Sequence, residues 1–301
     1  MRELIILQVT IFILVAVGYF IKKIHLLGKE GQKSVTDLVV NVVLPCNIVT
    51  SFLTKPTADT WRDCLLIFVI SLLIQLFAVA YGRISYRRIP EAHRKCVQYG
   101  IICSNAGFLG NPIAEGLYGA EGLMLASIYL IPQRVMMWSA GLTIFTRSMS
   151  RKATLKKVLT HPCVVACMIG MVLMFGGISL PEVLLTPLQT IGRCNTALSM
   201  LVIGMILGDM DLRTLLDWTV VRYTVERLVL IPLLIYAVCV LLGFDRIVTG
   251  LSVILAAMPA GATTSMLAAK YEVAPDFATK MVVFSTLCSI PTIAVWSILL
   301  H

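Results

Sequence analysis

Apolar residues gather along the chain in ten segments that are separated by short polar stretches. About 20 mostly apolar residues suffice for a helix to cross the hydrocarbon core of a bilayer, and each segment approaches that length. The segments cover residues 4–21, 34–53, 63–82, 96–118, 122–146, 161–178, 184–208, 223–243, 246–269 and 277–300. The stretches between them leave no room for a separate soluble domain. This pattern predicts an all-α membrane protein with ten transmembrane helices.

Two of the segments, the fourth and the ninth, contain residues that interrupt a helix. Ser104–Leu117 in segment four and Ala257–Ser265 in segment nine set proline, glycine and polar side chains inside apolar sequence. Proline lacks a backbone N–H and glycine is a poor helix former, so both helices are predicted to be broken. In segment four, Asn111 suits an N-cap and Pro112 the first helical position, which places the start of a second half-helix there.

The two breaks predict a binding site near the middle of the membrane. Irregular backbone at that depth is tolerated where it is buried in protein or lines a cavity, and a helix N-terminus offers free N–H groups to an anion. Interrupted segments in matching positions of two halves indicate the binding site of a secondary transporter. The candidate substrate-binding residues are Asn105, Asn111, Pro112, Pro259, Thr263 and Thr264. The alternative is that proline and glycine only kink the two helices and allow close packing.

Two charged residues lie inside the predicted spans near these breaks. Arg134 stands about twelve residues into segment five, which places it near the bilayer centre. Its planar guanidinium suits a carboxylate, so it is a further candidate substrate-binding residue. Glu115 lies in the first turn of the predicted half-helix and is a candidate proton or cation site. The alternative for both is structural: Arg134 pairs with Glu115 or bonds a carbonyl of the broken helix, and Glu115 compensates the helix dipole.

A second polar set lies in segments two and seven. Asn47, Arg193 and Asn195 are candidate coupling or gating residues together with Glu115. They either face the crossing from the opposite side or tie helices together by hydrogen bonds, and for Arg193 the structural role is favoured.

A faint internal match relates the two halves of the chain. Cys46–Leu53 resembles Cys194–Leu201 at an offset of 148 residues, and Pro112 and Pro259 are offset by 147. The near-equal offsets each join a predicted pair of equivalent helices. They predict two inverted five-helix repeats, residues 1–150 and 151–301, within one integrated membrane domain whose broken helices, spans four and nine, cross.

Composition and charge agree with a membrane protein. Apolar residues make up 58% of the chain and charged residues 14%, against roughly 25% charged residues in soluble domains. The net charge of +9 does not predict a nucleic-acid partner, because the basic residues gather in loops at Lys22–Lys33, Arg83–Lys95 and Arg147–Lys157. The loops on the other side hold Arg2, Lys55, Arg62 and Arg246. The positive-inside rule then places both termini outside the cytoplasm of a multi-pass protein of the plasma membrane, which in a bacterium is the inner membrane.

Several kinds of chemistry are disfavoured by the sequence. The nine cysteines are an odd number and most lie inside apolar segments, so they do not form a disulfide framework. Cys163 and Cys167 share a helix face without a nearby His, Asp or Glu, which favours packing over metal binding. The chain has no phosphate-binding G-x-x-x-x-G-K-[ST] loop and no readable H-E-x-x-H or serine–histidine arrangement. No cofactor, metal or enzymatic activity is predicted.

These motifs together resemble the auxin efflux carrier family, the bacterial relatives of plant PIN-type auxin exporters. The resemblance spans the chain and rests on Gly110-Asn111-Pro112, on Ala257-Met258-Pro259, on Leu201-Val202-Ile203-Gly204 and on the five-plus-five layout. It implies a scaffold part made of spans one, two, six and seven, and a transport part whose broken helices cross at the substrate site. It also implies elevator-type alternating access and a homodimer formed through the scaffold.

Two departures from the plant pattern point away from auxin. The residue after Pro112 is Ile113, where plant members have a second asparagine, and the loop between spans five and six is short. Bacterial members are associated with malate, malonate and other organic acids. We therefore expect a secondary active or facilitative transporter of small carboxylates, embedded in the lipid bilayer, with a proton or sodium as candidate coupling ion. The alternatives are a sodium-coupled organic-anion symporter of the bile-acid type and a membrane sensor or channel without turnover.

Overall fold

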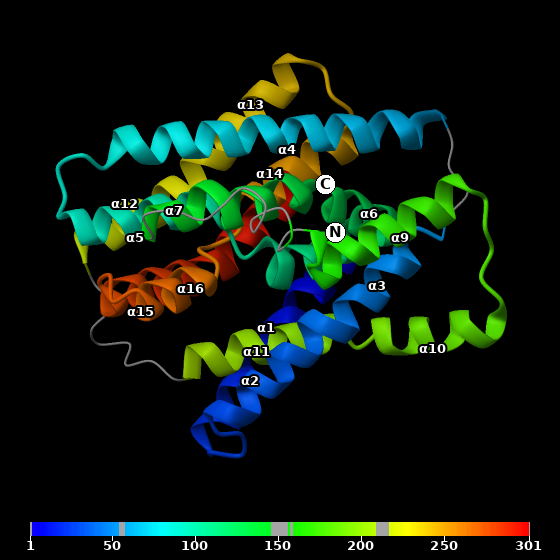
Figure 1. Cartoon of the computed structure of the whole chain (residues 1–301), viewed down its shortest axis with the longest axis horizontal. Coiled ribbons are helices and arrows are strands. Elements are labelled where there is room, and N and C mark those ends of the chain that lie inside the picture. Colours follow the sequence, from blue (N-terminus) through cyan, green and yellow to red (C-terminus); the bar gives the residue numbers. More distant parts are fainter. Residues whose placement is uncertain (1, 54–57, 146–155, 157–158, 209–216, 301) are drawn as a thin grey trace. The chain divides into compact units, whose positions relative to one another are not determined.

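The structure, a computed structural model, describes residues 2–53, 58–145, 156, 159–208 and 217–300. These residues are helical almost throughout, and the β-structure among them is one isolated bridge between Ser104 and Ala260. The helices of Figure 1 are α1 (Arg2–Lys23), α2 (Lys29–Leu38), α3 (Leu44–Ser51), α4 (Ala58–Ser85), α5 (Glu91–Ile102), α6 (Asn111–Met136), α7 (Leu142–Phe145), α9 (Pro162–Phe175), α10 (Glu182–Gly192), α11 (Asn195–Gly208), α12 (Trp218–Val225), α13 (Ile231–Leu241), α14 (Arg246–Ala256), α15 (Thr263–Lys270) and α16 (Pro275–Leu299). The predicted all-α class is confirmed.

Five helical stretches are long and apolar enough to cross a membrane, judged by length and composition among the described residues. They are Lys29–Ser51, Thr60–Ser85, Glu182–Gly208, Trp218–Leu241 and Pro275–Leu299. The ten membrane crossings and their inverted repeat stay predictions. The loop-charge argument also stays a prediction, because Lys55, the side chain of Arg2 and all of Arg147–Lys157 except Lys156 lie outside the described residues.

The chain forms two compact units, and neither coincides with one half of the sequence. Unit 1 consists of Met1–Cys64, Asn111–Ile128 and Thr160–Met210. Unit 2 consists of Leu65–Gly110, Tyr129–Leu159 and Asp211–His301. Each unit therefore draws helices from both halves of the chain.

In unit 1, α1 and α11 pack against each other (Figure 1). Glycines make this close approach possible. A Cβ atom on Gly204 would lie 2.0 Å from the carbonyl oxygen of Val15, and one on Gly18 would lie 2.2 Å from that of Leu201. Small residues at such contacts are typical of helix pairs in membranes.

Helix α3 is held in unit 1 between α9 and α10. On one side, a Cβ on Gly170 would lie 2.6 Å from the ring of Phe52. On the other side, a Cβ on Gly192 would lie 3.0 Å from the Cα atom of Asn47. The glycines thus allow α9 to approach the Phe52 ring and α10 to approach the backbone of α3 at Asn47.

Three prolines share one local structure, a π-helical turn that begins six residues before each of them. The turns are η1 (Val39–Val43) before Pro45, η2 (Ala106–Gly110) before Pro112 and η5 (Glu226–Leu230) before Pro232. A proline ring clashes with the carbonyl four residues earlier in an α-helix, and a wider turn relieves that clash without ending the helix. The chain therefore stays helical through each of these prolines.

Helix α6 consists of two helices that meet at Gly119. The φ of 65° and ψ of −154° at this glycine are not helical, and glycine adopts a positive φ without a steric penalty. After the turn, a Cβ on Gly122 would lie 2.3 Å from the carbonyl oxygen of Ala114. The predicted boundary between segments four and five, at residues 119–121, therefore coincides with a sharp turn.

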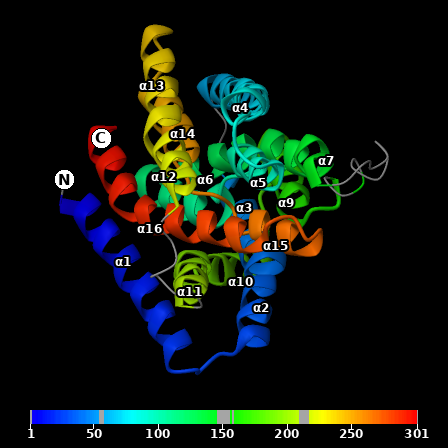
Figure 2. The same ribbon diagram turned by 90° about the vertical axis from the view of Figure 1, so that its left-hand side faces the viewer.

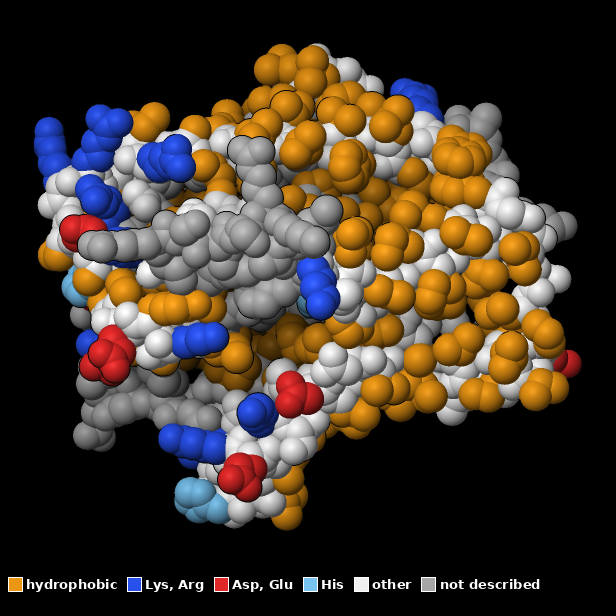
Figure 3. All heavy atoms as spheres, viewed as in Figure 1, with side chains coloured by type: hydrophobic (Ala, Val, Ile, Leu, Met, Phe, Trp, Pro, Cys, Tyr) orange, Lys and Arg blue, Asp and Glu red, His pale blue; other side chains and the backbone are white. Residues whose placement is uncertain are grey.

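In unit 2, the long α16 anchors the neighbouring helices. Figure 2 shows α15 beside α16 and α13 beside α14, and both pairs are in contact. The indole N–H of Trp296 in α16 donates to the carbonyl of Leu228 in η5 at 2.9 Å. Apolar side chains are exposed over α4 and α13 (Figure 3), as expected for surfaces that face lipid.

Candidate functional site

Two interrupted helices meet in unit 2 through their backbones. Helix α5 ends at Ile102 and α14 ends at Ala256, and a short non-helical stretch follows each end. Ser104 and Ala260 form an antiparallel bridge. The amide of Asn105 donates to the carbonyl of Pro259 at 2.8 Å, and the amide of Gly261 donates to the carbonyl of Cys103 at 3.0 Å. The predicted breaks in segments four and nine are confirmed, and the two broken stretches pair with each other.

Side chains from two other elements fasten this crossing. The amide nitrogen of Gln133 donates to the carbonyl of Ser104 at 2.9 Å, and the hydroxyl of Ser104 donates back to the Gln133 oxygen at 3.2 Å. The amide of Ala260 donates to the hydroxyl of Ser285 at 3.2 Å. These buried backbone groups therefore have partners although no helix supplies them.

Arg227 joins the C-terminal ends of both interrupted helices. Its Nε donates to the carbonyl of Met258 at 3.0 Å, and its Nη1 donates to the carbonyl of Ile101 at 3.1 Å. The side chain is buried, with 4% of its surface exposed. Helix C-termini carry unpaired carbonyls and a partial negative charge, which a guanidinium with fixed donors satisfies directly.

The opposite ends, where new helices begin, differ: in the first turn of α15 the amide of Thr264 donates to the backbone carbonyl of Gly261 at 2.9 Å. No side chain caps α15 at Ala262, and the first N–H groups of a helix have no partner within it. Beside the start of η2, a Cβ on Gly107 would meet no atom within 4 Å. Asn105, Gly107 and Thr263 are half-buried, so this part of the crossing is accessible. The side of the crossing where η2 and α15 begin therefore combines backbone N–H donors, the positive ends of helix dipoles and unfilled space beside Gly107.

The profile of the membrane transport protein family matches residues 4–157 and again residues 145–297. The chain belongs to this family. It is a transmembrane transporter of the auxin efflux carrier type, as its motifs predict. An uncharacterised transporter of Methanothermobacter thermautotrophicus is 26% identical over 295 residues, which cover 97% of this chain and 96% of the relative. An uncharacterised transporter of Methanocaldococcus jannaschii is 23% identical over 295 residues, or 95% of each chain. Family membership indicates a transport protein rather than an enzyme.

For this transporter, the structure corrects the role predicted for Asn111. The turn η2 runs directly into α6, and Gly110, the residue before Asn111, has helical angles of −71° and −42°. Asn111 is therefore inside a helix and is not an N-cap. The half-helix begins instead at Ala106, because the break falls where Ser104 pairs with Ala260, and Pro112 follows the π-helical turn.

Several predicted residues of the transporter carry buried polar atoms without a partner. Asn111 is fully buried, and neither its Nδ2 nor its Oδ1 has a hydrogen bond. Arg134 is 6% exposed and its Nη1 is unpaired, and the hydroxyl of the buried Thr264 is unpaired too. The hydroxyl of Thr263 lies 4.0 Å from the sulfur of Met137. Buried polar groups are usually satisfied, so these exceptions mark candidate ligand contacts.

In unit 1, the second polar set is only partly brought together. Asn47 Nδ2 donates to the Glu115 carboxylate at 2.9 Å, and both residues belong to this unit. Asn195 is buried, accepts a hydrogen bond from Ser199 at 3.3 Å and leaves its Nδ2 unpaired. Arg193 is exposed, although it is two residues from Asn195. The pairing of Arg134 with Glu115 stays a prediction, because these residues belong to different units.

The sequence analysis missed Arg227 and Gln133, although one of them was detectable. A charged residue inside an apolar span is a candidate functional residue by default, and Arg227 meets this criterion as well as Arg134 does. Gln133 gave no comparable signal, because a single neutral amide next to Arg134 does not stand out in a membrane helix. Its importance follows from its contact with Ser104, 29 residues away in the chain.

Proposed function

We propose that this transporter carries small organic anions, malate- or malonate-like carboxylates, by secondary active or facilitative transport. The observation that carries the proposal is the polarity of the crossing in unit 2. The carbonyl ends of α5 and α14 are neutralised by Arg227, whereas the start of α15 is uncapped and the start of η2 is open. An anion complements free N–H groups and positive dipole ends.

In this proposal, the carboxylate lies against the half-helix starts at Gly107 and Thr263. Asn105 and Thr263 are the accessible polar side chains beside it. Arg134 and Thr264 supply further donors, since each has a buried polar atom without a partner. Asn111 belongs to unit 1, and we propose it as a substrate contact on its own account, because both polar atoms of its buried amide are unpaired. Pro112 and Pro259 act through the backbone: Pro259 offers the carbonyl that holds Asn105, and Pro112 maintains the π-helical turn.

Elevator-type alternating access is the mechanism that we propose for moving the site. Unit 1 contains predicted spans one, two, six and seven, the scaffold part of the resemblance, together with Asn111–Ile128. Unit 2 contains both interrupted stretches and Arg227. Unit 2 also contains Gln133 and Ser285, so the paired breaks and the side chains that bond to them belong to one unit. This supports a design in which the paired breaks move as one body. We further propose a homodimer through the scaffold and both termini outside the cytoplasm.

Glu115 is the proposed coupling or gating group. Its carboxylate accepts a hydrogen bond from a neutral amide, that of Asn47, so it is free to change its charge without breaking an ion pair to that partner. Asn195 is the further buried polar side chain of this set. A proton or a sodium ion is the proposed coupling ion.

Ligand-induced thermal stabilisation of the purified protein tests this function. Sodium salts of malate, malonate, lactate, succinate and indole-3-acetate are compared with the potassium salts. A ligand that binds the folded state stabilises it, by about 2.7 kcal/mol at a concentration of 100 times its Kd. The transition temperature therefore rises. A shift with one acid in both salts is the expected result.

The other outcomes separate the alternatives. A shift in sodium alone would identify a sodium-coupled symporter of the bile-acid type. No shift with any carboxylate would contradict the organic-anion proposal. Counterflow of a labelled acid in proteoliposomes then distinguishes a transporter from a channel or sensor, because counterflow requires saturable exchange.

A further inference from the structure

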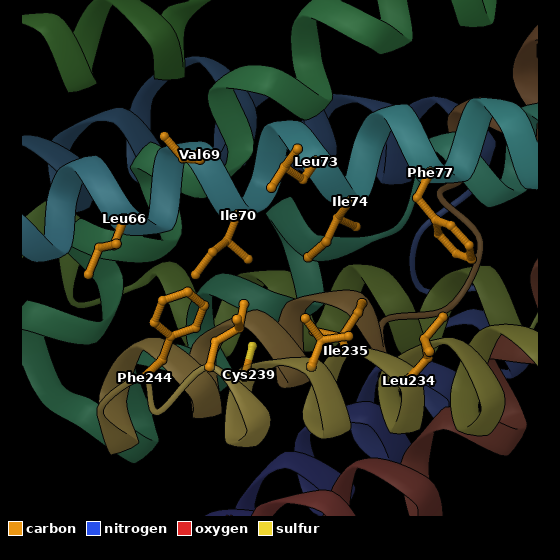
Figure 4. A pocket seen from close by; sticks show the side chains of 12 residues that line it. Leu66, Val69, Ile70, Leu73, Ile74, Phe77, Leu234, Ile235, Cys239 and Phe244 are labelled. Carbon is orange, nitrogen blue, oxygen red and sulfur yellow. The ribbon is translucent and has the colours of Figure 1, made fainter.

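An apolar groove runs between α4 and α13 of unit 2 (Figure 4). Its volume is about 290 Å³. Six residues of α4 from Leu66 to Phe77 and six residues from Leu234 to Phe244 line it, and all of them are apolar or cysteine. In Figure 4 the side chains of Ile70 and Ile74 point toward those of Ile235 and Cys239. Several of the lining side chains, Leu73, Leu234 and Leu242 among them, are exposed at the surface.

The length of the groove suits a hydrocarbon chain. Leu66 and Phe77 are eleven positions apart, about 16 Å at the rise of an α-helix. One leaflet contributes about half of the roughly 30 Å hydrocarbon core, or about 15 Å. The lining offers no polar partner, so an occupant of this part has to be apolar.

The same face of α4 continues into a basic pocket. Ile84 lies seven residues after Phe77, which brings it back to the same side of the helix. It borders a second cavity of about 410 Å³, which Ser85, Tyr86, Arg87, Arg88, Ile89 and Arg222 complete. Tyr81 lies between the two cavities on this face, half-buried. An apolar stretch, then a tyrosine, then arginines is the order found where a helix leaves the membrane.

The pocket carries a net positive charge. Arg222 is held by Glu226 at 2.7 Å and by the hydroxyl of Ser85 at 2.9 Å, and its guanidinium lies 4.6 Å from the centre of the Tyr86 ring. Arg87 and Arg88 are exposed, and neither has an ion pair among the described residues. Figure 3 shows Lys and Arg side chains gathered at this end of unit 2. Two guanidinium groups are therefore available to a phosphate, and a third is fixed beside them.

We propose that the groove and the pocket together bind one anionic phospholipid. Its phosphate lies against Arg87, Arg88 and Arg222, and one acyl chain lies along α4 and α13. The basic pocket selects the occupant, because an apolar groove alone would accept any lipid tail, whereas arginines at its end favour an anionic headgroup. This site is separate from the helix crossing, and its test does not depend on the transported substrate.

Native mass spectrometry of the full-length protein, titrated with phosphatidylglycerol or with phosphatidylcholine of the same acyl chains, tests the headgroup. We expect phosphatidylglycerol to bind about tenfold or more tightly. Arg87→Ala with Arg88→Ala removes most of this preference. The matched control is Arg83→Ala with Arg94→Ala, which removes the same charge from the same region but from outside the pocket and retains the preference.

A second variant pair tests the groove. Leu73 is 60% exposed and lines it, whereas Leu65 is 66% exposed on the same helix and does not. Leu73→Trp narrows the groove and is expected to weaken phosphatidylglycerol binding by about fivefold or more, while Leu65→Trp changes it less than about twofold.

Three results would overturn the proposal. The first is a lack of headgroup selectivity: either the wild-type protein binds the two lipids equally, or the double variant at Arg87 and Arg88 and its control at Arg83 and Arg94 lose the preference for phosphatidylglycerol to the same extent. The second is binding of soluble glycerol phosphate as tight as that of phosphatidylglycerol, because the groove would then contribute nothing. The third is a dimer that dissociates in Leu73→Trp, which would show that a second copy of the chain occupies the groove.

Discussion

Each unit contains a place where polar groups lie at a helix contact, and the two places are built in different ways. In unit 2 both helices are broken, and their backbones exchange hydrogen bonds at Asn105 and Gly261. In unit 1 helix α3 stays helical past Pro45 through a π-helical turn, and its polar contact is made by the side chains of Asn47 and Glu115. The crossing in unit 2 therefore depends on backbone geometry, whereas the contact in unit 1 depends on which side chains are present.

This difference predicts different sensitivities to mutation. Hydrogen bonds between backbone groups tolerate changes in the flanking side chains. The carbonyls that the breaks leave without a helical partner, however, require a donor from elsewhere. A contact between side chains is sensitive to changes in those side chains. It needs no extra partner for the backbone, because the helix already satisfies the backbone groups there. The predictions below run from the largest expected effect to the smallest.

The largest effect is expected for Arg227→Met. It leaves the carbonyls of Ile101 and Met258 buried without a donor, at about 1–3 kcal/mol each. We expect transport in proteoliposomes to be abolished and thermal stability to fall. Arg227→Lys keeps the charge but lacks the planar fork, so it restores stability only in part. Wild-type stability and transport in Arg227→Met would show that Arg227 does not hold the crossing.

Asn111→Ala is expected to reduce transport by about tenfold or more without loss of stability. Both side-chain polar atoms of Asn111 are buried and unpaired, so removing them relieves a desolvation penalty in the empty protein and removes a donor from the substrate. Uptake assays and thermal unfolding of the same preparation check this. A variant that loses stability and transport in parallel would assign Asn111 a structural role.

Pro112→Ala and Pro45→Ala form a matched pair, because each proline follows a π-helical turn. Pro112→Ala restores an amide next to the crossing and allows a regular helix, so transport is expected to fall while the amount of protein in the membrane changes little. Pro45→Ala makes the same local change in unit 1 and is expected to leave substrate affinity unchanged. Normal transport in Pro112→Ala would contradict the substrate role of this stretch.

Glu115→Gln sharpens the comparison in unit 1. It keeps a hydrogen-bond acceptor for Asn47 but removes the ionisable group. We expect the dependence of transport on pH or on sodium to flatten, while substrate affinity changes less than about threefold. Glu182→Gln, at an exposed glutamate of α10, is the control that retains the dependence. If Glu115→Gln also retains it, Glu115 is not the coupling group.

The smallest effect is expected for Arg193→Ala, because Arg193 is exposed and its side chain has no hydrogen bond or ion pair among the described residues. The transport rate should change less than about twofold, and the free energy of unfolding by less than about 0.5 kcal/mol, the usual range for surface substitutions. A large loss of transport would show that Arg193 acts in the site despite its exposure.

The positions of the breaks could be predicted closely, but their internal geometry could not. Proline, glycine and polar residues inside an apolar run mark where a helix fails, since these are properties of the local chain. Asn111 followed by Pro112 is a typical sequence for the start of a helix. The sequence alone does not show that a π-helical turn precedes Asn111 and that the helix is continuous across both residues. The true start depends on the pairing of Ser104 with Ala260, 156 residues later in the chain.

The sequence by itself determined that this protein is helical and membrane-embedded, because long apolar segments and breaker residues act locally, and its motifs showed the resemblance to its transporter family. The tertiary structure decided which groups meet at the crossing. Arg227, Gln133 and Ser285 satisfy backbone atoms that lie far from them in sequence. Hydrogen bonds of this kind depend on distances of about 3 Å between distant residues, and only the folded chain sets those distances.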